Sequence, residues 1–217
     1  MNPLAPTARR LFVHYRTAPL AGRLYVFARV LTCPFDAVAA RLPAQGTLLD
    51  VGCGSGLFAH LASARGLHVT GYDPDPRKVA LARASVQPGE TIDIHEGTLD
   101  TAATSGRRYE AVVFLDVLYL VPPDEQARQL RTAAGLLSPG GRLLVKTMHD
   151  ESPVRSALDG MQEAVATGIG MTKGEALKPP SEAFVRQVLE AEGLRVTSER
   201  IDRGYLHPHL LVVGDAP

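Results

Sequence analysis

The feature that most constrains this chain is a regular alternation of short apolar runs with helical stretches between residues 47 and 147. Five runs rich in Val, Leu and Ile predict strands at residues 47–51, 68–72, 91–95, 111–115 and 142–147. The intervening stretches predict helices at residues 57–65, 76–85 and about 124–137. Strand–helix–strand units of this length form right-handed crossovers, so we expect an α/β fold with a parallel sheet covered by helices on both faces.

The alternation changes after residue 150. Residues 150–180 predict a helical lid insert, with a helix near 154–167. A helix and two strands follow it, at residues 182–192, 194–200 and 209–213. The two strands are joined by too few residues for a crossover helix, so they should pair antiparallel. We therefore expect a single domain over residues 1–217, with an N-terminal helical arm at 1–40 that caps it.

Composition narrows the class of protein. The 217 residues carry 23 basic and 23 acidic side chains, so the chain as a whole gives no reason to expect a nucleic-acid partner. No apolar run reaches the roughly 18 residues that a transmembrane helix needs. Cys33 and Cys53 form neither a disulfide framework nor a metal-binding spacing, and His207 with His209 lacks a third ligand nearby. We therefore expect no transmembrane helix, no metal site and a cytoplasmic location.

A glycine-rich turn follows the first strand and reads Asp50-Val51-Gly52-Cys53-Gly54-Ser55-Gly56. Such a turn lets the backbone approach a ligand at the carboxyl edge of a parallel sheet. Its spacing is G-x-G-x-G rather than the G-x-G-x-x-G of dinucleotide sites, and Asp50 would repel a pyrophosphate but attract an ammonium group. Asp73 ends the second strand, where a carboxylate can accept both hydroxyls of a ribose. Asp75, followed by Pro76, is expected to cap the next helix.

Four motifs in order carry a resemblance to a known family: LLDVGCGSG, VTGYDPD, YEAVVFLDVLYLV and LLSPGGRLLVKT. Together they resemble the class I S-adenosylmethionine-dependent methyltransferases of bacterial small-molecule type over nearly the whole chain. The resemblance implies a Rossmann-like seven-stranded mixed sheet in the order 3-2-1-4-5-7-6, with strand 7 antiparallel. It also implies S-adenosyl-L-methionine as the cofactor.

The resemblance implies cofactor contacts from the glycine turn and from the ends of the first four strands. These are Asp50, Gly52, Cys53, Gly54, Gly56, Asp73, Pro74, Thr98, Leu99, Asp116 and Val117. Many members of the family place an acid after the third strand to bind the adenine amino group. This chain has Thr98 and Leu99 there, so we expect a hydroxyl and a backbone group to take that role. Cys53 is expected to be a small filler rather than a reactive thiol.

The acceptor of the methyl group is expected above the ends of the fourth and fifth strands. The resemblance places Asp116, Val117 and Tyr119 beside it, and His149 follows the fifth strand as the candidate general base. Structural roles compete with each assignment. Asp116 could cap a helix or form an ion pair, Tyr119 could belong to the core, and His149 could be an ordinary loop histidine. His14 in the arm is a weaker candidate base.

The arm is basic and contains an amphipathic stretch. Its first 35 residues include five arginines and no Asp or Glu. Leu20, Leu24, Phe27 and Leu31 fall on one helical face. We expect that face to pack toward the core across the active-site mouth. The alternative is an anionic partner for the arginines, such as an acidic substrate, a carrier protein or a membrane surface.

Arm and lid together predict an enclosed apolar pocket and hence a small or medium hydrophobic acceptor. Other function classes stay open. One is methylation of a macromolecular or carrier-bound acceptor, and another is a catalytically silent cofactor-binding module. An NAD-dependent oxidoreductase is opposed by Asp50, by the glycine spacing and by the terminal strand pair.

Overall fold

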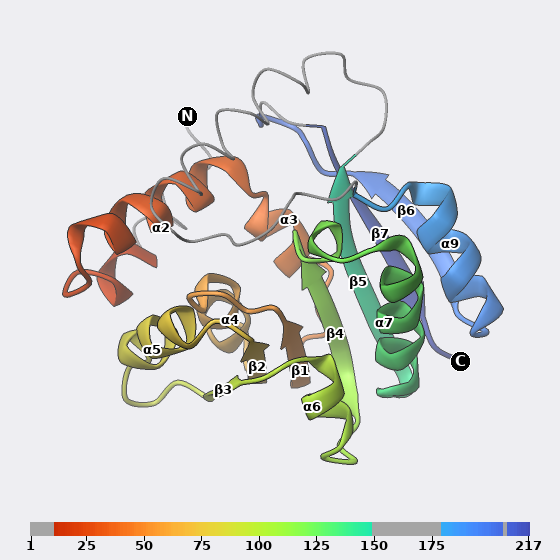
Figure 1. The fold of residues 1–217 in the computed structure, drawn as a ribbon, viewed down its shortest axis with the longest axis horizontal. Helices are drawn as coiled ribbons and strands as arrows, with labels where there is room; N and C mark the ends of the chain where they lie inside the picture. The colour runs from red at the N-terminus through yellow and green to blue at the C-terminus, as the bar shows by residue number, and fades with distance from the viewer. Residues whose placement is uncertain (1–10, 149–178, 206–207) are drawn as a thin grey trace.

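The computed structural model describes residues 11–148, 179–205 and 208–217, and these form a seven-stranded sheet flanked by helices (Figure 1). Its strands are β1 (Gly46–Val51), β2 (Leu67–Asp73), β3 (Ile92–Glu96), β4 (Tyr109–Leu115), β5 (Leu137–Met148), β6 (Arg195–Arg200) and β7 (His209–Asp215). Its helices are α2 (Leu20–Thr32), α3 (Phe35–Ala39), α4 (Leu57–Ser63), α5 (Pro76–Ser85), α6 (Leu99–Ala103), η1 (Leu118–Leu120), α7 (Pro123–Gly135) and α9 (Glu182–Ala191).

The sheet order confirms the expectation from the sequence. The strands run β3-β2-β1-β4-β5-β7-β6, and β7 is antiparallel to both β5 and β6. All other pairs are parallel. The carboxyl ends of β1, β2, β4 and β5 therefore meet at one edge of the sheet, where the loops that follow them can share a ligand.

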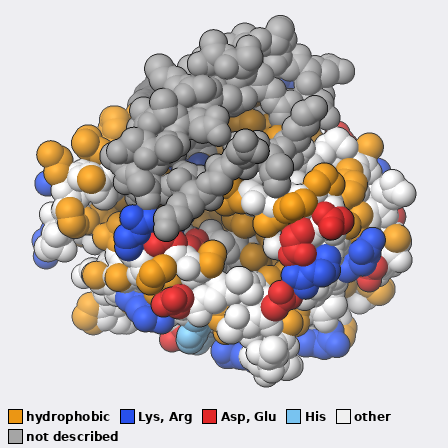
Figure 2. Space-filling view, in the orientation of Figure 1, with side chains coloured by type: hydrophobic (Ala, Val, Ile, Leu, Met, Phe, Trp, Pro, Cys, Tyr) orange, Lys and Arg blue, Asp and Glu red, His pale blue; other side chains and the backbone are white. Residues whose placement is uncertain are grey.

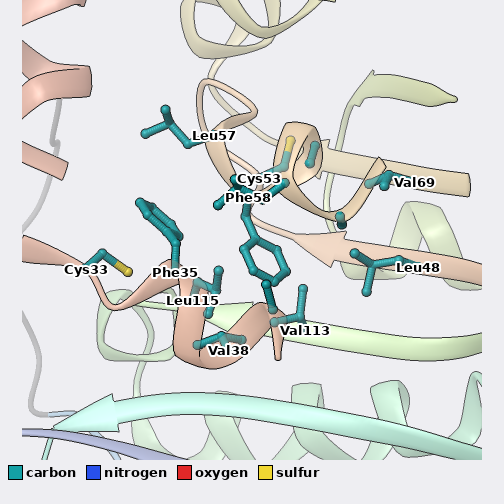
Figure 3. Packing of buried hydrophobic residues seen from close by; sticks show 14 of the residues in the cluster. Cys33, Phe35, Val38, Leu48, Cys53, Leu57, Phe58, Val69, Val113 and Leu115 are labelled. Atoms are coloured by element: carbon teal, nitrogen blue, oxygen red, sulfur yellow. The ribbon is translucent and has the colours of Figure 1, made fainter. Parts of the chain in front are cut away.

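Apolar side chains cover both faces of the sheet because successive residues of a strand point to opposite sides. Leu48 belongs to the core shared with α2 to α5, whereas Leu49 belongs to the core shared with α6, α7 and α9. Figure 3 shows part of the first core, in which Phe35 and Val38 of α3 lie beside Phe58 of α4. The helices on the two faces of the sheet therefore hold its strands, and the loops at their carboxyl ends, in place.

Several local differences separate the expected elements from the observed ones. The strand expected at 142–147 begins at Leu137, and the helix expected to reach 137 ends at Gly135. The short helices α3, α6 and η1 were not expected. Asp75 caps α5 as expected, because its carboxylate accepts the Arg77 amide hydrogen at 2.9 Å. The helix expected near 154–167, with most of the lid, lies outside the described residues, as does His149.

The orientation of α2 contradicts the expectation from the sequence. Leu20, Leu24, Phe27 and Leu31 are all exposed, and the buried residues of the helix are Val26 and Val30 on another side. The physical reason is the position of Arg29, which points inward to an ion pair described below. The expected core-facing stripe is therefore the outer surface of the helix.

The described residues include no helix that is long and apolar enough to cross a membrane.

Candidate functional site: the carboxyl edge of the sheet

The glycine turn is folded so that one side touches the residues after β4 and the other side is open. Gly52, Gly54 and Gly56 have φ angles of 68°, 56° and 84°, which favour glycine over any other residue. A Cβ at Gly52 would meet a Val117 methyl carbon at 2.6 Å, so this glycine is required by close packing. A Cβ at Gly54 would meet no described residue within 4 Å, so this side of the turn leaves room for a ligand.

Asp73 ties the turn to the end of β2. One of its carboxylate oxygens accepts a hydrogen bond from the Gly54 backbone amide at 2.9 Å, and the other accepts one from the Asp75 amide at 2.9 Å. Its side chain is buried. A carboxylate oxygen can accept more than one hydrogen bond, so Asp73 holds the turn and keeps acceptor capacity for a ligand.

Asp50 is the most electrostatically unusual group on this edge. It is 2% exposed, and its Oδ2 atom has no hydrogen-bond partner among the described residues. Burial, together with the nearby charge of Asp73, raises the pKa of its carboxyl to about 7. A buried acceptor without a donor is costly, so a cationic or hydrogen-bonding ligand beside Asp50 would relieve that cost.

The residues after β3 form a helix start. Thr98 caps α6 in a reciprocal arrangement with Thr101, so its hydroxyl already accepts one backbone hydrogen bond. The Leu99 side chain is buried in the core, which leaves its backbone as the group that a ligand could reach. Pro74 is exposed. The residues expected to contact the adenine therefore lie at this edge. Thr98 also caps a helix, a structural role that the sequence did not indicate.

Tyr15 in the arm is a component of the edge that the sequence reasoning missed. Its hydroxyl donates a hydrogen bond to the Ser55 carbonyl oxygen at 2.6 Å, and its side chain is fully buried. The hydroxyl also lies 3.8 Å from the position that a Cβ on Gly56 would take. The arm thus braces the glycine turn from behind.

Asp116, directly after β4, is the centre of an ion cluster in which Lys146 is buried and Asp116 and Arg29 are half-buried. Its carboxylate contacts Arg29 of α2 at 3.0 Å and the ammonium group of Lys146 of β5. Burial opposes ionisation of Asp116, but the charges of Lys146 and Arg29 outweigh it and hold the pKa of this carboxyl well below its usual range. The ion-pair role considered for Asp116 is therefore present in the structure.

Asp116 is also conformationally strained. Among the described residues it is the one non-glycine residue with a positive φ, 57°. Such a conformation costs about 1–3 kcal/mol and persists where the surroundings enforce it. Here the two cations supply that enforcement, because they fix both carboxylate oxygens. We call Arg29, Asp116 and Lys146 the edge cluster; the sequence did not place Arg29 or Lys146 at this site.

Tyr119 and Cys33 lie within electrostatic reach of the edge cluster. Tyr119 is half-buried, and burial, followed by the charge of Asp116, raises the pKa of its hydroxyl to about 12. Burial also raises the pKa of the Cys33 thiol to about 11, although Arg29 opposes the shift. Both groups are therefore neutral near pH 7. Burial likewise raises the pKa of the Cys53 thiol above its usual range, as a filler role requires.

One group of side chains in the described part of the chain places three metal-ligand atoms within 4.8 Å of one another: His14, His60 and Glu90. Its members come from the arm, from α4 and from the loop before β3, and both histidines contact Ser85 at the end of α5. The two imidazole rings are stacked at 3.9 Å with an interplanar angle of 22°. A metal ion lies near the plane of each ring that binds it, so two stacked rings do not present a preformed site. We assign this group to the packing of the arm.

Comparisons with known proteins show the family to which the chain belongs. A family model described as a methyltransferase domain matches residues 24–199. The chain is 34% identical over 130 residues to the ubiquinone biosynthesis O-methyltransferase of Cereibacter sphaeroides. That match spans 58% of this chain and 52% of the relative. The chain is 36% identical over 124 residues to the enzyme of the same name from Xanthomonas axonopodis pv. citri, covering 56% and 51%. The chain therefore spans about half the length of these curated relatives.

Solved structures show the same fold. A magnesium protoporphyrin IX methyltransferase from Synechocystis with bound SAH superposes with a TM-score of 0.65 at 21% identity, covering 84% of this chain and 82% of that one. An O-methyltransferase family protein from Burkholderia thailandensis gives a TM-score of 0.63 at 23% identity, covering 84% and 55%. At these identities the similarity confirms the Rossmann-like architecture.

Proposed function

This chain belongs to the methyltransferase-domain family of S-adenosyl-L-methionine-dependent enzymes, and from that premise we propose that it methylates a small or medium hydrophobic metabolite. The observation that carries the proposal is the meeting of two features at one sheet edge. The open glycine turn stands at the end of β1, and the edge cluster stands at the end of β4 and β5. Val117 packs against Gly52 and so joins them.

The residues of the turn suit the cofactor. Asp50 offers an unpartnered buried oxygen to the ammonium group, and Asp73 offers its remaining acceptor capacity to the ribose hydroxyls. Thr98, Leu99 and Pro74 would contact the adenine, and the backbone around Gly52, Cys53, Gly54 and Gly56 would approach the amino-acid part. When bound, the cofactor would supply a methyl group carried on a sulfonium. In-line attack by the acceptor atom would take the methyl group and release the sulfur as a thioether.

The edge cluster would position the acceptor. Asp116 is held ionised by two cations, so it is a poor proton acceptor and acts by fixing Arg29 and Lys146. Among the described residues, the edge cluster sets two cations against one anion at a partly buried place, which leaves an excess positive charge there. That excess favours an acceptor with an acidic group, such as a phenol or a carboxylic acid. Tyr119 would contact the acceptor as a neutral hydroxyl, and His149 remains our proposed general base.

The names of the relatives support a small-molecule acceptor, because the two reported above are O-methyltransferases of ubiquinone biosynthesis. A carrier-bound or macromolecular acceptor is the second candidate, and the exposed arginines Arg16 and Arg23 favour it. We also propose a cytoplasmic location, since Cys33 and Cys53 are both free thiols.

Calorimetric titration with S-adenosyl-L-methionine, S-adenosylhomocysteine and NAD tests the cofactor. We expect dissociation constants of about micromolar size for the first two and none for NAD. Asp73→Ala should abolish this binding, and Asp93→Ala, an exposed acid on β3, should leave it unchanged. Binding of NAD alone would refute the proposal. Cofactor binding without methyl transfer to any of a panel of lipophilic phenols and carboxylic acids would favour the catalytically silent module.

A further inference from the structure

Most of the large exposed apolar side chains in the described part of the chain lie on α2. Six large hydrophobic residues are exposed in the described part of the chain: Val13, Leu20, Leu24, Phe27, Leu31 and Leu120. Four of them form the outer stripe of α2, defined here as Leu20, Leu24, Phe27 and Leu31, with 44–69% of each residue exposed. In Figure 2 hydrophobic side chains gather at the end of the molecule where Figure 1 places α2. A continuous apolar stripe that is exposed to solvent indicates an interaction site.

The charge around the outer stripe is positive. Arg23 lies three residues after Leu20 and four before Phe27, so it borders the stripe, and Arg16 precedes the helix by one turn. Both are exposed, and neither forms an ion pair with a described residue. The first acidic residue of the chain is Asp36. The partner of this surface should therefore offer an apolar region to the outer stripe and negative charges to the arginines beside it.

We propose that α2 docks on the surface of a bilayer containing anionic phospholipid, with the outer stripe in the headgroup–acyl boundary. A helix of 13 residues is about 20 Å long, which suits a helix lying in the interface rather than one that spans it. A second copy of the chain fits less well, because pairing two such helices would bring Arg16 and Arg23 of each copy together without an acid to neutralise them.

This inference deepens the proposed function and rests on the proposal that the methyl acceptor is hydrophobic. A hydrophobic acceptor is concentrated in a membrane. The inward face of the same helix carries Arg29, which contacts Asp116 at the acceptor edge. One helix thus presents its outer stripe to lipid and its inner face to the site. Docking would hold the acceptor edge beside the surface from which a hydrophobic acceptor arrives.

Vesicle co-sedimentation tests the docking. The intact protein should bind vesicles of phosphatidylglycerol and phosphatidylcholine, and bind vesicles of phosphatidylcholine alone about tenfold more weakly. The double variant Leu24→Ser/Phe27→Ser and the variant Arg23→Glu should each lose about tenfold in partition coefficient. The matched control is Arg65→Glu, which makes the same charge change at an exposed position after α4 and should bind like the original.

The outcomes separate cleanly. Vesicle binding that is absent, or that survives in the double variant, overturns the docking surface. A dimer seen by light scattering and lost in the double variant, without vesicle binding, would assign the stripe to a second copy instead. Cofactor titration of the same variants is the independent readout: vesicle binding without cofactor binding would leave the docking surface standing and remove the proposed function.

Discussion

We expect the affinity for S-adenosyl-L-methionine to depend on pH near neutrality because of Asp50. Its carboxyl is buried, has an oxygen without a hydrogen-bond partner, and has its pKa raised to about 7. If the ammonium group of the ligand lies beside it, binding requires the ionised form. Protonation of Asp50 therefore competes with binding, and affinity should rise as the pH rises through the pKa of the free protein.

The magnitude follows from the fraction of Asp50 that is ionised. With a pKa of about 7, half of the carboxyl groups are ionised at about pH 7 and about one in thirty at about pH 5.5. The dissociation constant should therefore increase about fifteenfold over that interval if the bound form stays ionised. Asp50→Asn, which cannot ionise, should bind more weakly at pH 7 and show no such slope.

Calorimetric titration with S-adenosylhomocysteine, which keeps the ammonium group and transfers no methyl, is the assay.

The stability of the protein without ligand gives a second readout. Because the pKa of Asp50 lies above the 3.8 of a free carboxyl, its ionisation destabilises the fold, and stability falls as the pH rises from about 4 to about 7, by at most about 4 kcal/mol. Asp50→Asn should remove that loss. Equal pH slopes in the original and the variant would refute the reasoning.

Three further substitutions test the edge. Gly52→Ala should destabilise the protein by about 2 kcal/mol or more and abolish cofactor binding, because its Cβ would strike Val117 at 2.6 Å; an unchanged melting temperature would contradict this. Tyr15→Phe leaves the Ser55 carbonyl without its donor and should cost about 1–2 kcal/mol in urea unfolding. Lys146→Met should raise the pKa of the carboxyl it contacts and lower kcat/KM for acidic acceptors while cofactor affinity, measured as its control, stays the same.

The strands and helices could be predicted from the sequence because their determinants are local. Strand runs, glycine turns and the Asp75–Pro76 helix start are each read within a few residues, and the short link between the last two strands indicates their antiparallel pairing. The glycine turn and Asp73 were located for the same reason. The order of all seven strands was implied by the resemblance to the methyltransferase family and is confirmed by the structure. The short helix α6 could not be predicted, because a threonine before a five-residue helix has the same local pattern as a ligand-binding loop, and Thr98 was expected to contact the adenine rather than to cap a helix.

The orientation of α2 could not be predicted from its pattern. Hydrophobic periodicity identifies an apolar face but does not say which partner covers it. The face that turns inward is chosen by a distant contact, the ion pair of Arg29 with Asp116, 87 residues further along the chain. A periodicity rule assigns the larger apolar face to the core, and here the smaller pair Val26 and Val30 is buried instead.

Lys146 carries a signal that sequence reasoning can use in other chains. It stands in the fully buried run Leu143-Leu144-Val145-Lys146-Thr147 of β5, where an ammonium group needs an anion. In a parallel sheet the nearest candidates are acids at the ends of neighbouring strands, and Lys146 pairs in register with Leu115, the residue before Asp116. A lysine near the carboxyl end of a central strand therefore predicts its carboxylate on the adjacent strand. That carboxylate is held ionised, so it is better assigned to positioning than to proton transfer.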